Sequence, residues 1–599
     1  MKYRLSNEKI SSFRGDVISL RLISNGMVFK EKITWGSDNP EIVFIREFSG
    51  EDEDCFDDGV LLILTGKGDA LVWAETEGER YYCPIHSREA RKANPFDKMN
   101  YYIGDFHSHT TSNHDKKTFR EETENLSLMC SSQVKKEGLL DFFVLLDHAS
   151  LLDRRKFFEA HEAAESLHDE NFIPFAGAES EITIIEHDFY GVPHKNSGEV
   201  VTVNSAGFVN SNDWDSFYAE TGESPAAIGS LAHPQILGYS TPGIWNFSLF
   251  KKGTDKMKNI IHLVEMGNGG DRNQNLLHEY TYSEALDCGF RIAPVCTSDS
   301  HGPVWGYNAF PGKTIIMAPE KSKEMFLDAL KNARVYASES GNVKLYYTVN
   351  GYPASSTMVP AEEYKFFIHI SYFKPPGKER IIGLEVISDY GRTVKAVENI
   401  TGSSLEFTVK SPGARYFYLR LYGADGSKTW SAPVWTGSPF DKYIDPESYS
   451  TRLDKREFKA VDLLTGRIAD ELLSENPYDI WKSHIPEAEI EIDMGREYEI
   501  CALGYYPHPL SSSDRSDPLL MSGANFISEY EIYAAVDRNS YVKCTDGIIR
   551  SFGGEQIITF SRIRAKYVKF KVISTVGRAS GKIKYRNAPV YIGELNIFA

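Results

Sequence analysis

Histidines and carboxylates recur in pairs where short apolar runs end. His107 and His109 stand in IGDFHSHT, and Asp299 and His301 stand in VCTSDSHG with the same i, i+2 spacing. On a strand, residues i and i+2 point to one side, so both members of a pair can reach one ion. Divalent ions held by such groups activate water for hydrolysis. The pattern therefore predicts a metal-dependent hydrolase site between Gly104 and Gly302.

Histidines and carboxylates also stand at the ends of other apolar runs. They are Asp147 and His148 in FFVLLDHA, Glu179 and Glu181 in GAESEI, His187 in EHDFYG and His233 in SLAHPQ. A charge at the end of a buried strand is costly unless something binds there. One such histidine alone is more often packed in a core, but several strand ends together favour a shared site. Two residues keep a simpler reading: His114 as a surface loop residue and Glu265 as a residue that only closes a strand.

Alternating strands and helices must position these residues. From about 100 to 340, apolar runs alternate with helix-period segments such as LLDRRKFFEAHEAAESLH. This alternation predicts a parallel sheet or barrel, in which ligands bind at the C-terminal ends of the strands. Residues 1–95, 341–438 and 465–599 are rich in short β-runs separated by turn signals, which predicts β-sandwiches. The predicted fold is thus a multidomain chain with a central α/β barrel flanked by all-β domains.

The motifs GDFHSHT, LLDHA, GAESEI, LAHPQ, LVEMGNGG and RIAPVCTSDSHG together resemble the PHP (polymerase and histidinol phosphatase) family of metal-dependent phosphoesterases, in family order over about residues 100–345. The resemblance is greatest to the branch that includes carbamate-ester hydrolases. It implies a distorted (β/α)7 barrel that holds two or three divalent ions.

The resemblance also implies a ligand set and roles within it. One ion would take His107, His109 and Asp299 with a bridging Glu179, a second would take His187 and His233, and a third would take His114, His148 and His301. Glu179, Asp299 and His233 would be the catalytic residues. The stretch ESE leaves Glu181 open as an alternative to Glu179. Nitrogen and oxygen ligands suit zinc, manganese or iron, and the sequence does not choose among them.

The flanking segments resemble binding modules. ITWGSDNPEIVFI, within 1–95, resembles bacterial Ig-like domains of the second type. AEIEIDMGREYEICALGYYP and YIGELNIF, within 465–599, resemble the discoidin (coagulation-factor type C) family, which many carbohydrate-binding modules share. This resemblance implies a glycan ligand for the last segment, with a purely structural module as the alternative.

Charge and composition exclude some partners. The net charge of -18 and the absence of a basic run argue against nucleic acid as a main partner. The seven cysteines form no CxxC, which predicts reduced, buried thiols. No apolar run is long enough to span a membrane. The start MKYRLSNEKI has no signal-peptide pattern, so the sequence favours the cytoplasm, and export stays open if a signal was removed.

We therefore expect a hydrolase whose di- or trinuclear metal cluster attacks a phosphoester on a small-molecule or glycan-linked substrate. Two alternatives remain at this stage. One keeps the cluster and replaces the phosphoester by a carboxylic or carbamate ester. The other is a glycan-binding scaffold with an inactive barrel.

Overall fold

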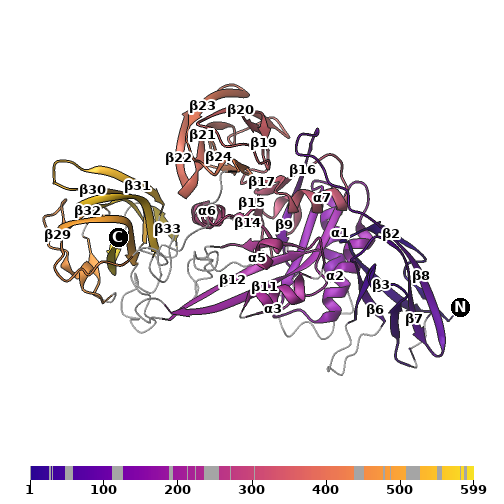
Figure 1. Ribbon diagram of the computed structural model, residues 1–599. Helices are drawn as coiled ribbons and strands as arrows, with labels where there is room; N and C mark the ends of the chain where they lie inside the picture. Colours follow the sequence, from indigo (N-terminus) through magenta and orange to yellow (C-terminus); the bar gives the residue numbers. More distant parts are fainter. Residues whose placement is uncertain are drawn as a thin grey trace.

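A computed structural model describes residues 2–25, 29, 31–47, 58–110, 126–187, 193–211, 213–222, 224–234, 255–269, 272–302, 304–437, 451–476, 479–483, 485, 487–506, 526–548, 556–579, 582–585 and 590–599. Figure 1 shows the N-terminal strands beside α2, the central sheet with its helices, a group of strands from β18 to β24, and the C-terminal strands at the far end from the N-terminus.

The N-terminal segment consists of two four-stranded sheets, in the orders β1-β3-β6-β5 and β2-β8-β7-β4. The strands are β1 (Tyr3–Leu5), β2 (Ile10–Phe13), β3 (Val17–Ser24), β4 (Thr34–Ser37), β5 (Val43–Glu47), β6 (Gly59–Leu64), β7 (Gly68–Thr76) and β8 (Glu79–Arg88).

Strand β6 joins this segment to the central one, because both of its faces are buried. Leu62 and Leu64 face the core between the two sheets. Leu61 and Ile63 face the other way and pack with Phe157 and Phe158 of helix α2. The run GVLLIL therefore lacks the alternation of a half-exposed strand, as expected for a strand covered on both sides.

The central segment carries the strands that end in the predicted ligands. Its strands are β9 (Asn100–Ser108), β10 (Phe142–His148), β11 (Ile173–His187), β12 (Pro193–Val203), β13 (Ile228–Ala232), β14 (Ile261–Asn268), β15 (Ala293–Thr297), β16 (Lys313–Ala318) and β17 (Val335–Ser338). Its helices are α1 (Leu126–Glu137), α2 (Arg154–Leu167), α3 (Trp214–Thr221), α5 (Asp255–Ile260), α6 (Arg272–Asp287) and α7 (Lys323–Lys331), with a 3-10 turn η3 (Gly306–Asn308).

The predicted (β/α)7 barrel is not supported. Strands β9, β10 and β11 pair in parallel, and so do β13, β14 and β15. Between these two groups, β11 and β12 form a long antiparallel hairpin, and β16 pairs antiparallel with both β9 and β17. The described helices are too few for seven strand-helix units. The sequence predicted a regular alternation of strands and helices. It did not predict the β11–β12 hairpin, because the sequence of β12 has no periodic pattern that sets it apart from a segment connecting two parallel strands.

The next strands do not form a separate body in the sheet pairing. They are β18 (Val343–Val349), β19 (Tyr352–Pro353), β20 (Glu363–Tyr372), β21 (Ile381–Ser388), β22 (Arg392–Glu398), β23 (Ser404–Lys410), β24 (Tyr416–Gly423), β25 (Lys428–Trp430) and β26 (Val434–Trp435), with the 3-10 turn η4 (Asp389–Gly391). One sheet has the order β19-β18-β20-β23, whereas β25, β24, β21 and β22 continue the central sheet through β17. The predicted break near residue 340 is therefore bridged by strand pairing, and both Trp430 and Trp435 are buried in packing positions.

The C-terminal strands have a hydrophobic core of their own. They are β27 (Lys459–Asp462), β28 (Trp481–Lys482), β29 (Ala488–Tyr506), β30 (Phe526–Ala535), β31 (Val542–Ile548), β32 (Gln556–Ala579), β33 (Lys582–Tyr585), β34 (Tyr591–Ile592) and β35 (Glu594–Phe598), with the 3-10 turn η6 (Asp470–Leu473). A seven-stranded antiparallel sheet is built around β29 and β32, and β28 and β34 form a separate two-stranded sheet. The stretch from Ala488 to Tyr506 forms the single long strand β29.

Candidate metal centre

Strand pairing brings the predicted residues to one place. The register of β10 and β11 sets His148 beside Glu179. The chain just after β15 returns to the end of β9: the Asp299 amide donates to the His107 carbonyl, and the His109 amide donates to the Ser300 carbonyl. His233 directly follows β13. The ends of β9, β10, β13 and β15, together with Glu179 within β11, therefore contribute side chains to one site.

Two of these residues hold unusual backbone conformations. His233 has a φ of 22° and Asp299 a φ of 48°, both in the left-handed region that residues other than glycine rarely adopt. Such strain costs on the order of 1–3 kcal/mol and concentrates at functional sites. The strain is consistent with two turns shaped to aim a side chain at a fixed point.

The first group of ligand-type atoms surrounds His109. Its Nε2 lies 2.9 Å from Nε2 of His107, 2.9 Å from Oδ1 of Asp299 and 3.3 Å from Oε2 of Glu179. The His301 ring lies 4.1 Å from the His109 ring, centroid to centroid. His107 and His109 are fully buried, whereas His301 is half-buried at the open side.

The second group surrounds Glu179. His148 Nδ1 lies 2.8 Å from Glu179 Oε2, and His233 Nε2 lies 3.1 Å from Glu179 Oε1. Glu199 of β12 joins this group, with Oε2 3.3 Å from His233 Nε2 and Oε1 3.7 Å from His148 Nδ1. Glu179 thus lies between the two groups, where one carboxylate can contribute an oxygen to each.

The ligand-type atoms in these two groups are better placed to bind a cation than to form hydrogen bonds with one another. His107 Nδ1 lies 2.7 Å from Glu265 Oε1 and donates to that carboxylate, so in the neutral imidazole Nε2 presents a lone pair. That lone pair faces the Nε2 of His109. Oε2 of Glu179 is buried and has no well-oriented hydrogen bond, although three imidazoles surround it. Lone pairs that converge in a buried space repel one another unless a positive charge lies between them.

By distance alone, three sets of residues place their ligand-type atoms close enough to hold one metal ion. They are His109, His148 and His301; His107, His109 and Asp299; and His148, Glu179 and Glu199. In each, the candidate atoms lie within 4.8 Å of one another, and all are nitrogen or oxygen. This donor set suits zinc, manganese or iron.

Glu265 and Asn268 of β14 hold the ligand-type residues in place. Glu265 is fully buried, and its second oxygen accepts from the His233 amide at 2.8 Å. The Asn268 side-chain amide donates to Glu265 Oε2 and to Asp299 Oδ2. One carboxylate therefore orients His107 and fixes the turn at His233, as expected for a residue that supports metal ligands.

Asp147 has a comparable role beside His109. Its two oxygens accept from the Thr110 amide at 2.7 Å and from the Thr110 hydroxyl at 2.8 Å. These bonds fix the chain one residue after His109. Asp147 therefore positions the β9 end, and its Oδ1 lies 4.0 Å from His109 Nδ1.

The charges of the site favour added positive charge. Burial lowers the pKa of His107, but Glu179, Glu265 and Asp299 outweigh it and raise that pKa well above its ordinary value. For His233, Glu179 likewise outweighs burial and raises the pKa to about 10. Burial raises the pKa of Glu179, yet His107, His148 and His233 hold it well below its usual range. Without metal, protons supply the positive charge, so protons and metal compete for the same sites.

The structure places most, but not all, of the predicted residues. His107, His109, His148, Glu179, His233, Asp299 and His301 come together. Glu179 is buried among the histidines, whereas Glu181, two residues on, is exposed. His114 and the side chain of His187 lie outside the described residues. Sequence reasoning missed Glu199 and Asn268, and it interpreted Glu265 only as a residue that closes a strand.

The comparisons with known proteins give partial matches only. No family model and no curated protein matches this chain. Among solved structures, CpGH89CBM32-5 from Clostridium perfringens, in complex with GalNAc-β-1,3-galactose, is 21% identical, covers 25% of this chain and 100% of its own, and has a TM-score of 0.19. The family 32 CBM from Clostridium perfringens NanJ, in complex with galactose, is 18% identical over 25% of this chain and 99% of its own, with a TM-score of 0.19. The C-terminal domain of a chitobiase from Bacteroides fragilis is 16% identical, covers 24% of this chain and 96% of its own, and has a TM-score of 0.18.

Two of these three are by title carbohydrate-binding modules, the class that the sequence predicted for residues 465–599. At these identities and TM-scores the likeness decides neither the fold nor the ligand of this chain. Within the part of the chain that the structure describes, no helix is long and apolar enough to cross a membrane.

Proposed function

We propose that this chain is a metal-dependent hydrolase of phosphoesters. The observation that carries the proposal is the convergence of lone pairs: His107 Nε2, oriented by Glu265, faces His109 Nε2 at 2.9 Å, with Asp299 and Glu179 completing the group. Two or three divalent ions bound here would activate water and neutralise charge on the attacked group.

The residues of the chain have separable tasks in such a reaction. Glu179 would hold the two groups at a fixed separation because its oxygens face different histidines. Glu265 keeps the hydrogen of His107 on Nδ1. Glu199, only half-buried at the edge of the cluster, is placed to accept a proton as water is consumed. His301 lies on the open side, where substrate would enter.

A second candidate, a carboxylic or carbamate ester as substrate, is favoured by one observation. Among the described residues, the groups in contact with the cluster are imidazoles, carboxylates and the Asn268 amide. A phosphoester would meet no ammonium or guanidinium among them.

The glycan-associated part of the proposal has a different basis, namely the discoidin resemblance of residues 465–599.

A panel of nitrophenyl esters with zinc, manganese or iron(II) tests these proposals. Turnover of phosphomonoesters or phosphodiesters above that of carboxylate esters supports the first candidate, and the reverse order supports the second. Absence of turnover with every ester and metal, in protein that binds metal, would leave only the inactive scaffold.

A further inference from the structure

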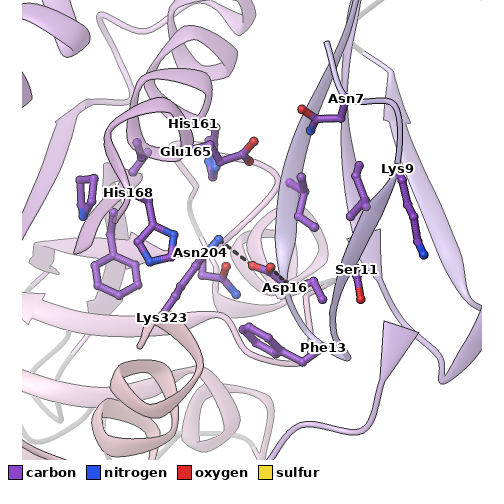
Figure 2. A pocket seen from close by; sticks show the side chains of 17 residues that line it. Asn7, Lys9, Ser11, Phe13, Asp16, His161, Glu165, His168, Asn204 and Lys323 are labelled. Carbon is purple, nitrogen blue, oxygen red and sulfur yellow. Dashed lines mark hydrogen bonds and ion pairs between the residues drawn. The ribbon is translucent and has the colours of Figure 1, made fainter. Parts of the chain in front are cut away.

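A cavity lies at the beginning of β11, away from the metal centre. It has a volume of about 390 Å³ and opens between the N-terminal strands β2 and β3 and the central elements α2, β11 and α7. Figure 2 shows its side chains, with His161 and Glu165 of α2, and His168 just after the helix, facing Asp16 and Phe13 across the space.

This cavity is separate from the metal centre. Its floor includes Pro174, Phe175 and Ala176, at the beginning of β11, whereas Glu179 comes three residues further along the strand. At roughly 3.3 Å per residue, Ala176 and Glu179 are about 10 Å apart along β11. No residue that lines the cavity belongs to the groups that surround His109 or Glu179.

His161 gives the cavity an unused acceptor. Its ring hydrogen-bonds the backbone of Ser205, whereas Nε2 is buried and has no partner in the described structure. Because the backbone bond favours a hydrogen on Nδ1, Nε2 carries a lone pair. A buried nitrogen without a partner destabilises the protein, and a hydrogen bond from a ligand would remove that cost.

The other charged groups of the cavity are balanced. Lys323 Nζ lies 2.6 Å from Asp16 Oδ1 (Figure 2), and it also donates to the Val17 carbonyl at 3.2 Å. Glu165 accepts from the Ser19 amide and hydroxyl at 2.6 and 2.8 Å. Lys323 is thus paired with Asp16, Glu165 is held by Ser19, and Lys9 is exposed to solvent. A free anion would meet the oxygens of Asp16 and Glu165, and a free cation would meet Lys323, so neither sign is favoured.

Apolar rings lie beside these polar groups. Phe13 and Phe175 line the same space, together with Ile10 and Ile18. Flat apolar faces next to a few convergent polar groups are typical of sites for small ligands that have both an apolar face and hydroxyl edges. Sites for small molecules also occur preferentially where two domains meet.

We propose that this cavity binds a neutral polyhydroxylated ligand of monosaccharide size, with a ligand hydroxyl donating to His161 Nε2 and ring faces against Phe13 and Phe175. The site is independent of the proposed hydrolase activity. Binding would also link the N-terminal strands to α2, since the ligand would contact both.

Calorimetric titration of the full-length protein tests the proposal. The neutral probes are glucose, galactose and N-acetylglucosamine, and the charged controls of the same ring size are glucosamine and glucuronate. We expect at least one neutral sugar to bind and both charged sugars to bind more weakly. His161→Leu should weaken the binding by roughly tenfold or more, because the buried acceptor is lost.

Two further variants make the result specific. His86→Leu is the matched control: His86 is an exposed histidine of β8 outside the cavity, and its replacement should leave binding unchanged. Ser11→Leu places bulk at the exposed mouth, where folding is little affected, and should weaken binding as His161→Leu does. Equal binding in wild type, His161→Leu and Ser11→Leu would place the sugar elsewhere and overturn the proposal. So would a lack of binding by every neutral sugar, or a preference for either charged one.

Discussion

At the scale of single residues, Glu179 is the residue whose loss should matter most. It lies 2.8 Å from His148 and 3.1 Å from His233, and it belongs to both groups of ligand-type atoms. We predict that Glu179→Gln lowers ester turnover roughly 10³-fold or more, comparable to the loss of a main electrostatic stabiliser. Glu181→Gln is the matched control, because Glu181 is exposed. Steady-state kinetics at saturating metal measures both, and an active Glu179→Gln beside an inactive Glu181→Gln would show that the ligand is two residues away.

His301 should behave differently from Glu179. It is half-buried, and its ring contacts His109 on the open side of one group only. His301→Ala should therefore weaken one ion, lose less activity than Glu179→Gln, and recover part of it in excess metal. Titration of activity against metal concentration shows this as a shifted midpoint with a preserved maximum. A lost maximum that no metal restores would contradict the prediction.

Glu265 is a positioning residue, and its test is metal affinity. It orients His107 through Nδ1 and holds the His233 amide. Removing a partner that supports a ligand typically costs 10–100-fold in metal affinity. We expect Glu265→Gln to lose affinity within about this range while the melting temperature at saturating metal falls little. Unchanged metal affinity would contradict this role and would favour the other interpretation of the sequence, in which Glu265 only closes a strand.

At the scale of elements, helix α2 makes the stability of the protein depend on pH through Glu165. Burial raises the pKa of Glu165 to about 7, above the ordinary value of 4.5. The folded state therefore keeps a proton that the unfolded state has lost. Its contribution to stability is complete below about pH 4.5 and is lost as the pH rises through 7, on the order of 3 kcal/mol in all.

Glu165→Gln isolates this effect. His161 acts in the opposite sense, since burial lowers its pKa to about 3 and acid then favours unfolding. The comparison is therefore the change in melting temperature between about pH 5 and pH 8, wild type against Glu165→Gln. We expect wild type to lose more stability, or gain less, than the variant over this interval. Identical changes in the two proteins would show that Glu165 titrates in the folded state as it does in water.

The elements also show how far the sequence could lead. The i, i+2 spacing led to His107 with His109 at the end of β9, as strand geometry predicts. It also led to Asp299 with His301, although that pair lies in the turn after β15 and not on a strand. Glu199 could not be found in this way, since it reaches the cluster only through the β11–β12 hairpin, whose pairing depends on tertiary contacts. The sequence indicates Glu265 only as a strand-closing residue, whereas it lies within β14 and its carboxylate holds His107 and the His233 amide. The same hairpin is one reason why the predicted barrel is not supported.

At the scale of the whole molecule, the C-terminal strands should be dispensable for chemistry. Their apolar residues form a core without members from the central segment, and the metal centre takes no described residue from them. We predict that a chain ending at Gly437 hydrolyses a small soluble ester at nearly the rate of the full chain. The truncated protein must keep its cooperative melting for the comparison to hold. A loss beyond about tenfold in folded protein would show that these strands shape the active site.

The central claim concerns metal, and elemental analysis tests it most directly. Wild type and the double variant His107→Ala/Asp299→Ala are purified with the same supplied zinc, manganese or iron, dialysed, and measured for bound metal per folded chain. The account predicts two or three ions in wild type and a clear loss in the variant, because two ligands of one group are gone. Less than one ion per wild-type chain, unchanged in the variant, would contradict it.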